Sequence, residues 1–366
     1  MTKIILDKLL DRRKIVPFYR ERNVASLNVL PPVSVEFHWT SNCNYDCVHC
    51  SYGSRRKSTS FLDANTIDSL VDDLISLRCK AVYLSGGGEP TVVKGWDQYS
   101  SKLVDHGIEV ALITNGVAIK EKHLPEVRRM NYVAVSVYST FEERYKKITD
   151  SNFFEGQFSL PMKVKAQPTN TVVGARCVLN DINSDEVFLI YNKAVESGFD
   201  YIIFIPAVDY EGRGVVLAND NAERVQNTIR EKMDLFDLNR TNVSSLMSRG
   251  VSHYEKNDYR SSLPLPVSGC KAIQIRSGAF VNYDGGVYLC QPDIGNKDLE
   301  IGNLRDNGFK KIWNSERHLG VLDLLNSRYG EGSCKNCRSI AFNQAMYEED
   351  IGLNADKVGS ILDPFL

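Results

Sequence analysis

An α/β fold in the form of a partial barrel, with six parallel strands, is predicted by three observations. Short runs rich in β-branched and aromatic residues alternate with amphipathic helical patterns from about residue 34 to residue 206. The alternation repeats about six times without reversal, and right-handed crossovers of this kind curl a sheet toward a half-barrel. The chemically distinctive motifs also follow directly after strands. The pattern leaves a doubly wound open sheet as the alternative.

Strands and helices are expected in strict alternation along this region. The first helix is the clearest, because apolar residues recur from Ile67 at i, i+3, i+4, i+7 and i+8 while aspartates take the opposite face. In either fold, the loops at the C-terminal ends of the strands form the functional edge. The expected strands cover residues 35–39, 81–85, 109–114, 133–137, 172–179 and 201–205, and the later helices cover residues 96–104, 120–130, 141–148, 184–197 and 221–236.

Beyond the barrel, the chain changes character twice. Residues 207–266 are polar and only partly helical, which is typical of a bridging region. A compact C-terminal domain is expected over residues 267–345, where two β-rich runs flank Asn282-Tyr283-Asp284-Gly285-Gly286, a hairpin signal. The expected organisation is therefore an N-terminal extension (1–33), a barrel (34–206), the bridge, the C-terminal domain and a tail (346–366).

Charge and hydropathy limit the partners and the location. Lys and Arg number 44 against 46 Asp and Glu, so the net charge of -2 provides no basic field for nucleic acid or anionic lipid. No apolar run approaches the ~20 residues that span a bilayer, and charged residues interrupt the N-terminus where a signal peptide would be apolar. We expect a cytoplasmic protein with no membrane partner. Because that compartment keeps thiols reduced, the nine cysteines are expected to be ligands or buried side chains.

Three cysteines follow the first expected strand in a C-x3-C-x2-C arrangement. Cys43, Cys47 and Cys50 place three thiols in one loop. Three thiolates can hold an iron–sulfur cluster and leave one iron open to an exogenous ligand. The alternatives are a zinc site completed by His49 and three buried structural cysteines.

A glycine-rich turn follows the second expected strand, in the sequence Ser85-Gly86-Gly87-Gly88-Glu89-Pro90. Consecutive glycines allow a ligand to approach the backbone closely, and a neighbouring carboxylate can receive an ammonium group. A ligand with an α-amino group fits this combination. Such turns are often purely structural, but this one comes directly after the cysteine loop in the order of strands.

Together these motifs resemble the radical S-adenosylmethionine (SAM) superfamily, with His49 at the position before the last cysteine. The resemblance implies a 4Fe-4S cluster on the three cysteines, with the unique iron chelated by the amino and carboxylate groups of SAM. Reductive cleavage would then give methionine and a 5'-deoxyadenosyl radical that abstracts a substrate hydrogen. It also implies SAM contacts from Gly86, Gly87, Gly88, Glu89, His49, Asn115, Ser136 and Arg176.

Four further cysteines, Cys270, Cys290, Cys334 and Cys337, fall in the C-terminal region. Four thiolates fit either a structural zinc site or a second 4Fe-4S cluster. Their order around the hairpin and the final C-x2-C resembles the SPASM/twitch extension of radical SAM enzymes. Since the full SPASM pattern has seven or more cysteines, the resemblance implies one auxiliary 4Fe-4S cluster here.

The resemblance implies a radical SAM oxidoreductase of a biosynthetic pathway, acting on a small metabolite or a peptide and reduced by a donor such as flavodoxin or ferredoxin. Oxidation or bond formation is expected. An epimerase of a peptide or sugar-like metabolite, the alternative, needs a thiol hydrogen donor, and Cys79 and Cys177 are expected to be buried away from the lumen. A non-catalytic zinc scaffold is the remaining alternative. Residues 151–170 and 209–266 are candidate surfaces for the substrate.

Overall fold

The computed structural model describes residues 30–53, 60–207, 216–249, 269–313 and 315–330, with residues 339, 343 and 346. The strands are β1 Ser34–Phe37, β2 Ala81–Leu84, β3 Glu109–Thr114, β4 Tyr132–Ser136, β5 Val172–Leu179, β6 Tyr201–Pro206, β7 Gly278–Val281, β8 Gly286–Tyr288 and β9 Gly302–Asn303. The helices are α3 Ala64–Ser76, α4 Trp96–Asp105, α5 Leu124–Val127, α6 Glu142–Thr149, α7 Leu160–Lys165, α8 Val187–Glu196, α9 Asn219–Glu231, α10 Val243–Arg249, α11 Lys271–Gln274, α12 Phe309–Trp313 and α13 Glu316–Gly330.

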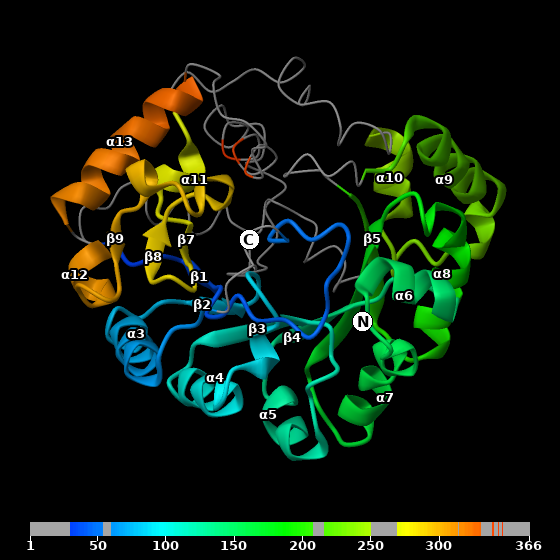
Figure 1. The fold of residues 1–366 in the computed structure, drawn as a ribbon, viewed down its shortest axis with the longest axis horizontal. Coiled ribbons are helices and arrows are strands. Elements are labelled where there is room, and N and C mark those ends of the chain that lie inside the picture. Colours follow the sequence, from blue (N-terminus) through cyan, green and yellow to red (C-terminus); the bar gives the residue numbers. More distant parts are fainter. Residues whose placement is uncertain are drawn as a thin grey trace, which may run out of the picture.

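The strands form one curved sheet in the order β6-β5-β4-β3-β2-β1-β7-β8-β9. From β1 to β6 each strand lies parallel to the next one along the chain. A doubly wound sheet would reverse its strand order at a switch point, and this sheet does not. The predicted α/β partial barrel is confirmed, and Figure 1 shows α3, α4, α5, α7 and α8 around its outer side.

Period-two alternation along the strands separates two faces of the sheet. The outward residues, such as Val35, Leu84 and Val133, are buried beneath the helices in the main apolar core. The inward face of β2, β3 and β4 carries small residues and two tyrosines, Tyr83 and Tyr132. The crossover helices therefore cover the outward face, and the inward face is turned toward the inside of the partial barrel.

The crossover helices are positioned by local signals in the sequence. The Asp63 side chain accepts a hydrogen bond from the Thr66 backbone N–H and so caps the start of α3. The helix then buries Ile67, Leu70, Val71 and Leu74 against the sheet. No helix in the described ranges is long and apolar enough to cross a membrane.

The C-terminal hairpin joins the barrel sheet directly. β7 pairs in parallel with β1, with Ser34 opposite Gly278, and β8 then pairs antiparallel with β7. Gly285 takes a positive φ of 89° in the turn that the sequence predicted.

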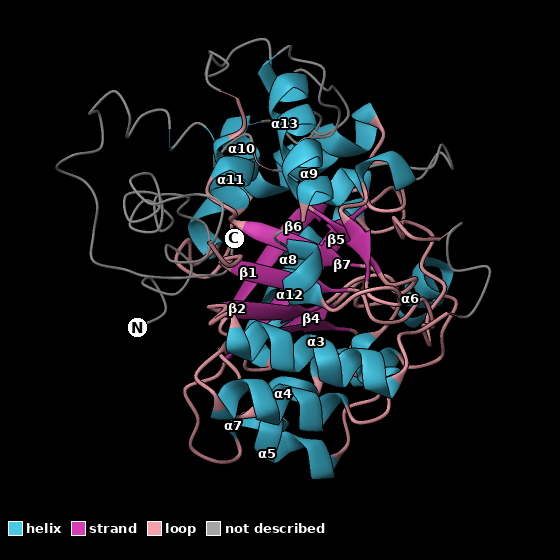
Figure 2. Cartoon of the chain, turned by 90° about the vertical axis from the view of Figure 1, so that its left-hand side faces the viewer, coloured by secondary structure: helices cyan, strands magenta, loops and turns pink. Residues whose placement is uncertain are grey.

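The helices lie on two sides of the strands when the molecule is turned by 90°. Figure 2 shows α3, α4, α5 and α7 on one side of the strands and α9, α11 and α13 on the other.

The two candidate substrate surfaces are described in part. Residues 151–170, a candidate surface for the substrate, contain a 3₁₀ turn at Phe154–Phe158 and helix α7, and Gln157 in this crossover is buried. The second expected surface, residues 209–266, lies partly outside the described residues.

Candidate active site at the strand ends

The cysteine loop leaves the C-terminal end of β1 and gathers its three thiols beside aromatic rings. Cys43, Cys47 and Cys50 belong to a cluster that also contains Tyr45 and Tyr138. Cys47 is buried, whereas Cys43 and Cys50 are partly exposed. No group of three His, Cys, Asp or Glu within the described ranges is close enough to hold a single metal ion. The loop supplies three thiols, two of them partly exposed, and three thiolates are the number that holds a cluster with one open iron.

Helix α6 holds this loop from one side. The Asp46 backbone N–H donates to the carbonyl of Thr149 at 2.8 Å, and the Val48 N–H donates to the carbonyl of Ile148 at 2.9 Å. These carbonyls belong to the last turn of α6, where intrahelical donors are missing. The loop therefore satisfies the end of the helix while the helix fixes the loop.

The glycine turn after β2 packs directly against the same loop. The Gly88 N–H donates to the Thr40 carbonyl at 2.7 Å, and the Glu89 N–H donates to the Asn42 carbonyl at 2.9 Å. A Cβ on Gly88 would lie only 1.9 Å from the Asn42 carbonyl oxygen, so glycine is required at this contact. The structure thus brings together the two motifs that the sequence singled out.

The Glu89 carboxylate braces the turn against β3. It accepts hydrogen bonds from the Thr114 hydroxyl at 2.6 Å and the Asn115 backbone N–H at 2.8 Å, as well as from Thr91. Burial raises the pKa of Glu89, and these hydrogen bonds act in the opposite direction. The side chain anticipated beside an ammonium group is thus also a structural link between two strand ends.

Four further predicted residues lie around this centre. The Asn115 side chain donates to the Asn44 side-chain oxygen at 2.6 Å, which links β3 to the cysteine loop. His49 contacts the Tyr138 ring, with centroids 5.3 Å apart. Ser136 and Arg176 are paired neighbours on β4 and β5, and the Arg176 Nε has no hydrogen-bond partner within the described residues.

The C-terminal cysteines are only partly in view. Cys270 is buried, and its sulfur accepts a hydrogen bond from the Asn343 side chain at 3.4 Å. Cys290 follows β8 and is partly exposed. Cys334 and Cys337 lie outside the described residues. The structure therefore locates two of the four predicted auxiliary ligands.

Comparison with family models decides the identity of the two regions. The model of the radical SAM superfamily matches residues 38–211, and the model of the SPASM iron–sulfur cluster-binding domain matches residues 270–338. The chain is a radical SAM protein with a C-terminal SPASM domain. Radical SAM and SPASM domains carry 4Fe-4S clusters and use SAM, so the chain has these cofactors.

Two relatives extend over most of this radical SAM/SPASM chain. "Mycofactocin maturase MftC" of Mycolicibacterium smegmatis is 23% identical over 314 residues, covering 84% of this chain and 75% of that protein. "AdoMet-dependent heme synthase" of Methanosarcina barkeri is 23% identical over 351 residues, covering 85% of this chain and 92% of that protein.

Solved structures show the same fold. AnSMEcpe with bound AdoMet and Cp18Cys peptide superposes with a TM-score of 0.60 at 17% identity, covering 86% of this chain and 88% of that one. Streptococcus suis SuiB bound to precursor peptide SuiA gives 0.60 at 13% identity, covering 84% and 69%.

The radical SAM domain also contains polar residues that the sequence analysis did not select. His38 on the inward side of the β1 end is fully buried, and its ring lies 2.8 Å from the Glu36 carboxylate and 2.9 Å from the Tyr52 hydroxyl. A Cβ on Gly86 would lie 2.5 Å from His38, so the ring supports the glycine turn. The sequence could have indicated His38 as an inward-facing polar residue, because Glu36 and His38 alternate with the apolar residues Val35, Phe37 and Trp39.

Proposed function

We propose that this chain is a radical SAM oxidoreductase that modifies a peptide. The observation that carries the proposal is the interlocked cysteine loop and glycine turn, joined at Gly88 and Asn42. An open-iron cluster and an amine-binding turn have to lie side by side for SAM to contact both. A zinc scaffold would need no such junction.

We assign Cys43, Cys47 and Cys50 to the first cluster, and SAM to the space beside Gly86, Gly87 and Gly88. When bound, the cluster supplies the electron for SAM cleavage, and SAM supplies the hydrogen-abstracting radical. The residues of the chain hold and orient SAM. The glycine turn offers backbone atoms to the amino group. The Arg176 Nε on β5, which has no hydrogen-bond partner among the described residues, suits a carboxylate. Asn115 and Ser136 present polar side chains from adjacent strand ends.

A peptide substrate is supported by the relatives. The similar proteins include a mycofactocin maturase, and the similar structures hold a Cp18Cys peptide or the precursor peptide SuiA. We propose Cys270, Cys290, Cys334 and Cys337 as ligands of one auxiliary 4Fe-4S cluster. We also propose that residues 34–206, 207–266 and 267–345 are the barrel, the bridge and the cluster domain, between an extension (1–33) and a tail (346–366).

Net oxidation is favoured over epimerisation by the positions of the two remaining thiols. Cys177 is fully buried beneath the helices, where burial raises its pKa. The Cys79 sulfur lies 3.3 Å from the Ala81 carbonyl oxygen, in the same apolar core. Neither thiol is on the inward face, where a hydrogen donor to a substrate radical would be needed. Reduced thiols and a flavodoxin or ferredoxin donor suit a cytoplasmic protein.

The function can be tested with anaerobically reconstituted protein, dithionite, SAM and a candidate precursor peptide. We expect release of 5'-deoxyadenosine and a peptide that has lost two hydrogen atoms. Incorporation of solvent deuterium without that mass loss would identify an epimerase instead. Bound zinc without nucleoside release would overturn the enzyme proposal.

Arg176→Ala is expected to weaken SAM binding about tenfold, because it removes a charged hydrogen-bond donor worth ~1.5 kcal/mol or more. Isothermal titration of SAM into the reconstituted protein measures the change. Arg230→Ala, on the exterior helix α9, is the matched control and should bind SAM as the wild type does. An unaltered affinity in Arg176→Ala would remove Arg176 from the site.

Cys337→Ala is expected to lower the iron content of the reconstituted chain by about four atoms if the second site is a 4Fe-4S cluster. Iron and sulfide analysis measures this loss. Cys79→Ala, which removes a core thiol, provides the control. Iron content equal to that of the wild type would exclude Cys337 as a necessary ligand.

A further inference from the structure

The hydroxyl of Tyr138, just beyond the end of β4, lies against a thiol of the cysteine loop. Its hydroxyl oxygen lies 3.6 Å from the Cys47 sulfur, within hydrogen-bonding distance for sulfur. The ring is buried and contacts the rings of His49 and Tyr45, with centroids 5.3 and 6.3 Å apart. A second hydrogen bond links the Tyr138 hydroxyl to Ser136.

Side chains hold the backbone of Tyr138 on both sides. Its N–H donates to the Gln157 side-chain oxygen at 3.0 Å, and its carbonyl accepts from the Asn183 side-chain amide at 2.8 Å. The other end of the Gln157 amide donates to the Ser139 carbonyl at 3.0 Å. Gln157 and Asn183 are both fully buried. Such a satisfied buried network leaves the residue little freedom to move.

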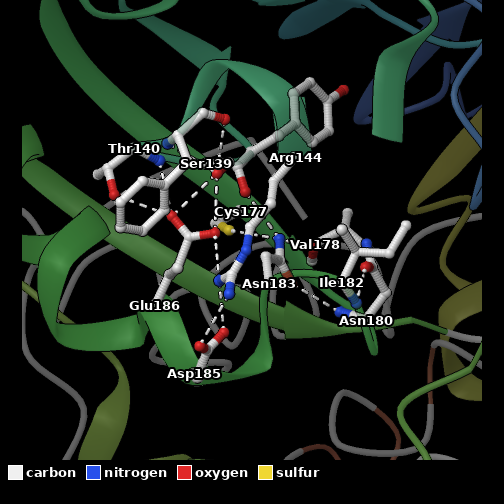
Figure 3. A network of polar contacts seen from close by, with 12 residues as sticks. Ser139, Thr140, Arg144, Cys177, Val178, Asn180, Ile182, Asn183, Asp185 and Glu186 are labelled. Carbon is white, nitrogen blue, oxygen red and sulfur yellow. Dashed lines mark hydrogen bonds and ion pairs between the residues drawn. The ribbon is translucent and has the colours of Figure 1, made fainter. Parts of the chain in front are cut away.

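The fully buried Glu186 carboxylate secures the next two residues. It accepts hydrogen bonds from the Ser139 hydroxyl at 2.8 Å and from the Thr140 backbone N–H at 2.7 Å. The Arg144 guanidinium lies 3.0 Å from the Glu186 carboxylate and also pairs with Asp185, which completes the network (Figure 3). Since Arg144 belongs to α6, the same network fixes the helix whose last turn holds the cysteine loop.

We propose that the Tyr138 hydroxyl donates a hydrogen bond to the Cys47 thiolate and thereby raises the reduction potential of the first cluster. The inference rests on the proposed assignment of Cys47 as a cluster ligand. A donor to a ligand sulfur stabilises the more negative, reduced state, and hydrogen bonds to sulfur are among the factors that set cluster potentials. A phenol is a donor at neutral pH. Tyr138 is therefore a positioning and tuning residue, and Gln157, Asn183 and Glu186 hold it in place.

Tyr138→Phe is expected to shift the reduction equilibrium of this cluster about tenfold toward the oxidised form, a decrease of about 59 mV for one electron. The measurement is a redox titration of the reconstituted full chain, followed by the electron paramagnetic resonance signal that changes on addition of SAM. Tyr145→Phe is the matched control, because it removes a hydroxyl that is paired with Tyr45 in the same aromatic cluster. Its potential should equal that of the wild type.

An unchanged potential in iron-replete Tyr138→Phe would overturn the inference, as would an equal decrease in Tyr145→Phe. If Tyr138→Phe fails to retain iron, 3-fluorotyrosine at position 138 decides, because its more acidic hydroxyl should raise the potential. An unchanged or lowered value there would contradict the proposed hydrogen bond. Cys47→Ala should lose the SAM-sensitive signal, and its persistence would overturn the ligand assignment and this inference with it.

Discussion

Alanine in place of Cys43, Cys47 or Cys50 is expected to abolish 5'-deoxyadenosine release. Each replacement removes one of the three thiolates that the loop supplies, and the first cluster then lacks one of its protein ligands. The iron signal of the auxiliary cluster should remain, because Cys270 and Cys290 lie in another part of the chain. Product analysis and Mössbauer spectroscopy of the same sample measure both effects.

Cys79→Ala is the appropriate control for these variants. It also removes a buried thiol, but that thiol points into the apolar core beneath the helices. Cleavage of SAM should continue in this variant. Undiminished nucleoside release from any variant of the three-cysteine loop would show that the loop does not carry the catalytic cluster.

Gly88→Ala is expected to separate the glycine turn from the cysteine loop. The added methyl group would lie 1.9 Å from the Asn42 carbonyl oxygen. This oxygen belongs to the backbone, so no side-chain rotation can relieve the clash. Relief would require a backbone shift, at a cost of at least ~2 kcal/mol in the free energy of unfolding. We expect a lower melting temperature and a loss of SAM binding of tenfold or more, measured by calorimetry and by titration.

Gly320→Ala is the matched control for this change. Gly320 lies in α13, and an added Cβ would meet no atom within 4 Å. Alanine stabilises a helix interior by ~0.5–1 kcal/mol relative to glycine, so this variant should melt at the same temperature as the wild type or higher. Wild-type affinity for SAM in Gly88→Ala would show that the contact with Asn42 does not shape the site.

The sequence predicted the barrel and the two interlocked motifs because each is encoded locally. Alternating apolar patterns specify the strands, and Cys43 and Gly88 fall where consecutive strands end. The supports of Tyr138 were not predictable in this way. Gln157 lies in a segment without clear periodicity, and Glu186 resembles an ordinary acidic residue at a helix start. Their roles arise only when the chain folds, because Gln157 and Glu186 come from separate segments and contact residues that follow β4. A local sequence pattern does not encode such contacts.

The parallel pairing of β7 with β1 has a consequence for synthesis of the chain. Val35 lies opposite Ala279, which belongs to a partner strand that emerges from the ribosome more than two hundred residues later. Until then β1 lacks its partner strand on this side, and a strand edge without a partner can pair with strands of other molecules. A nascent chain that stalls before β7 should therefore self-associate, and a chaperone that covers this edge would be most useful during that interval.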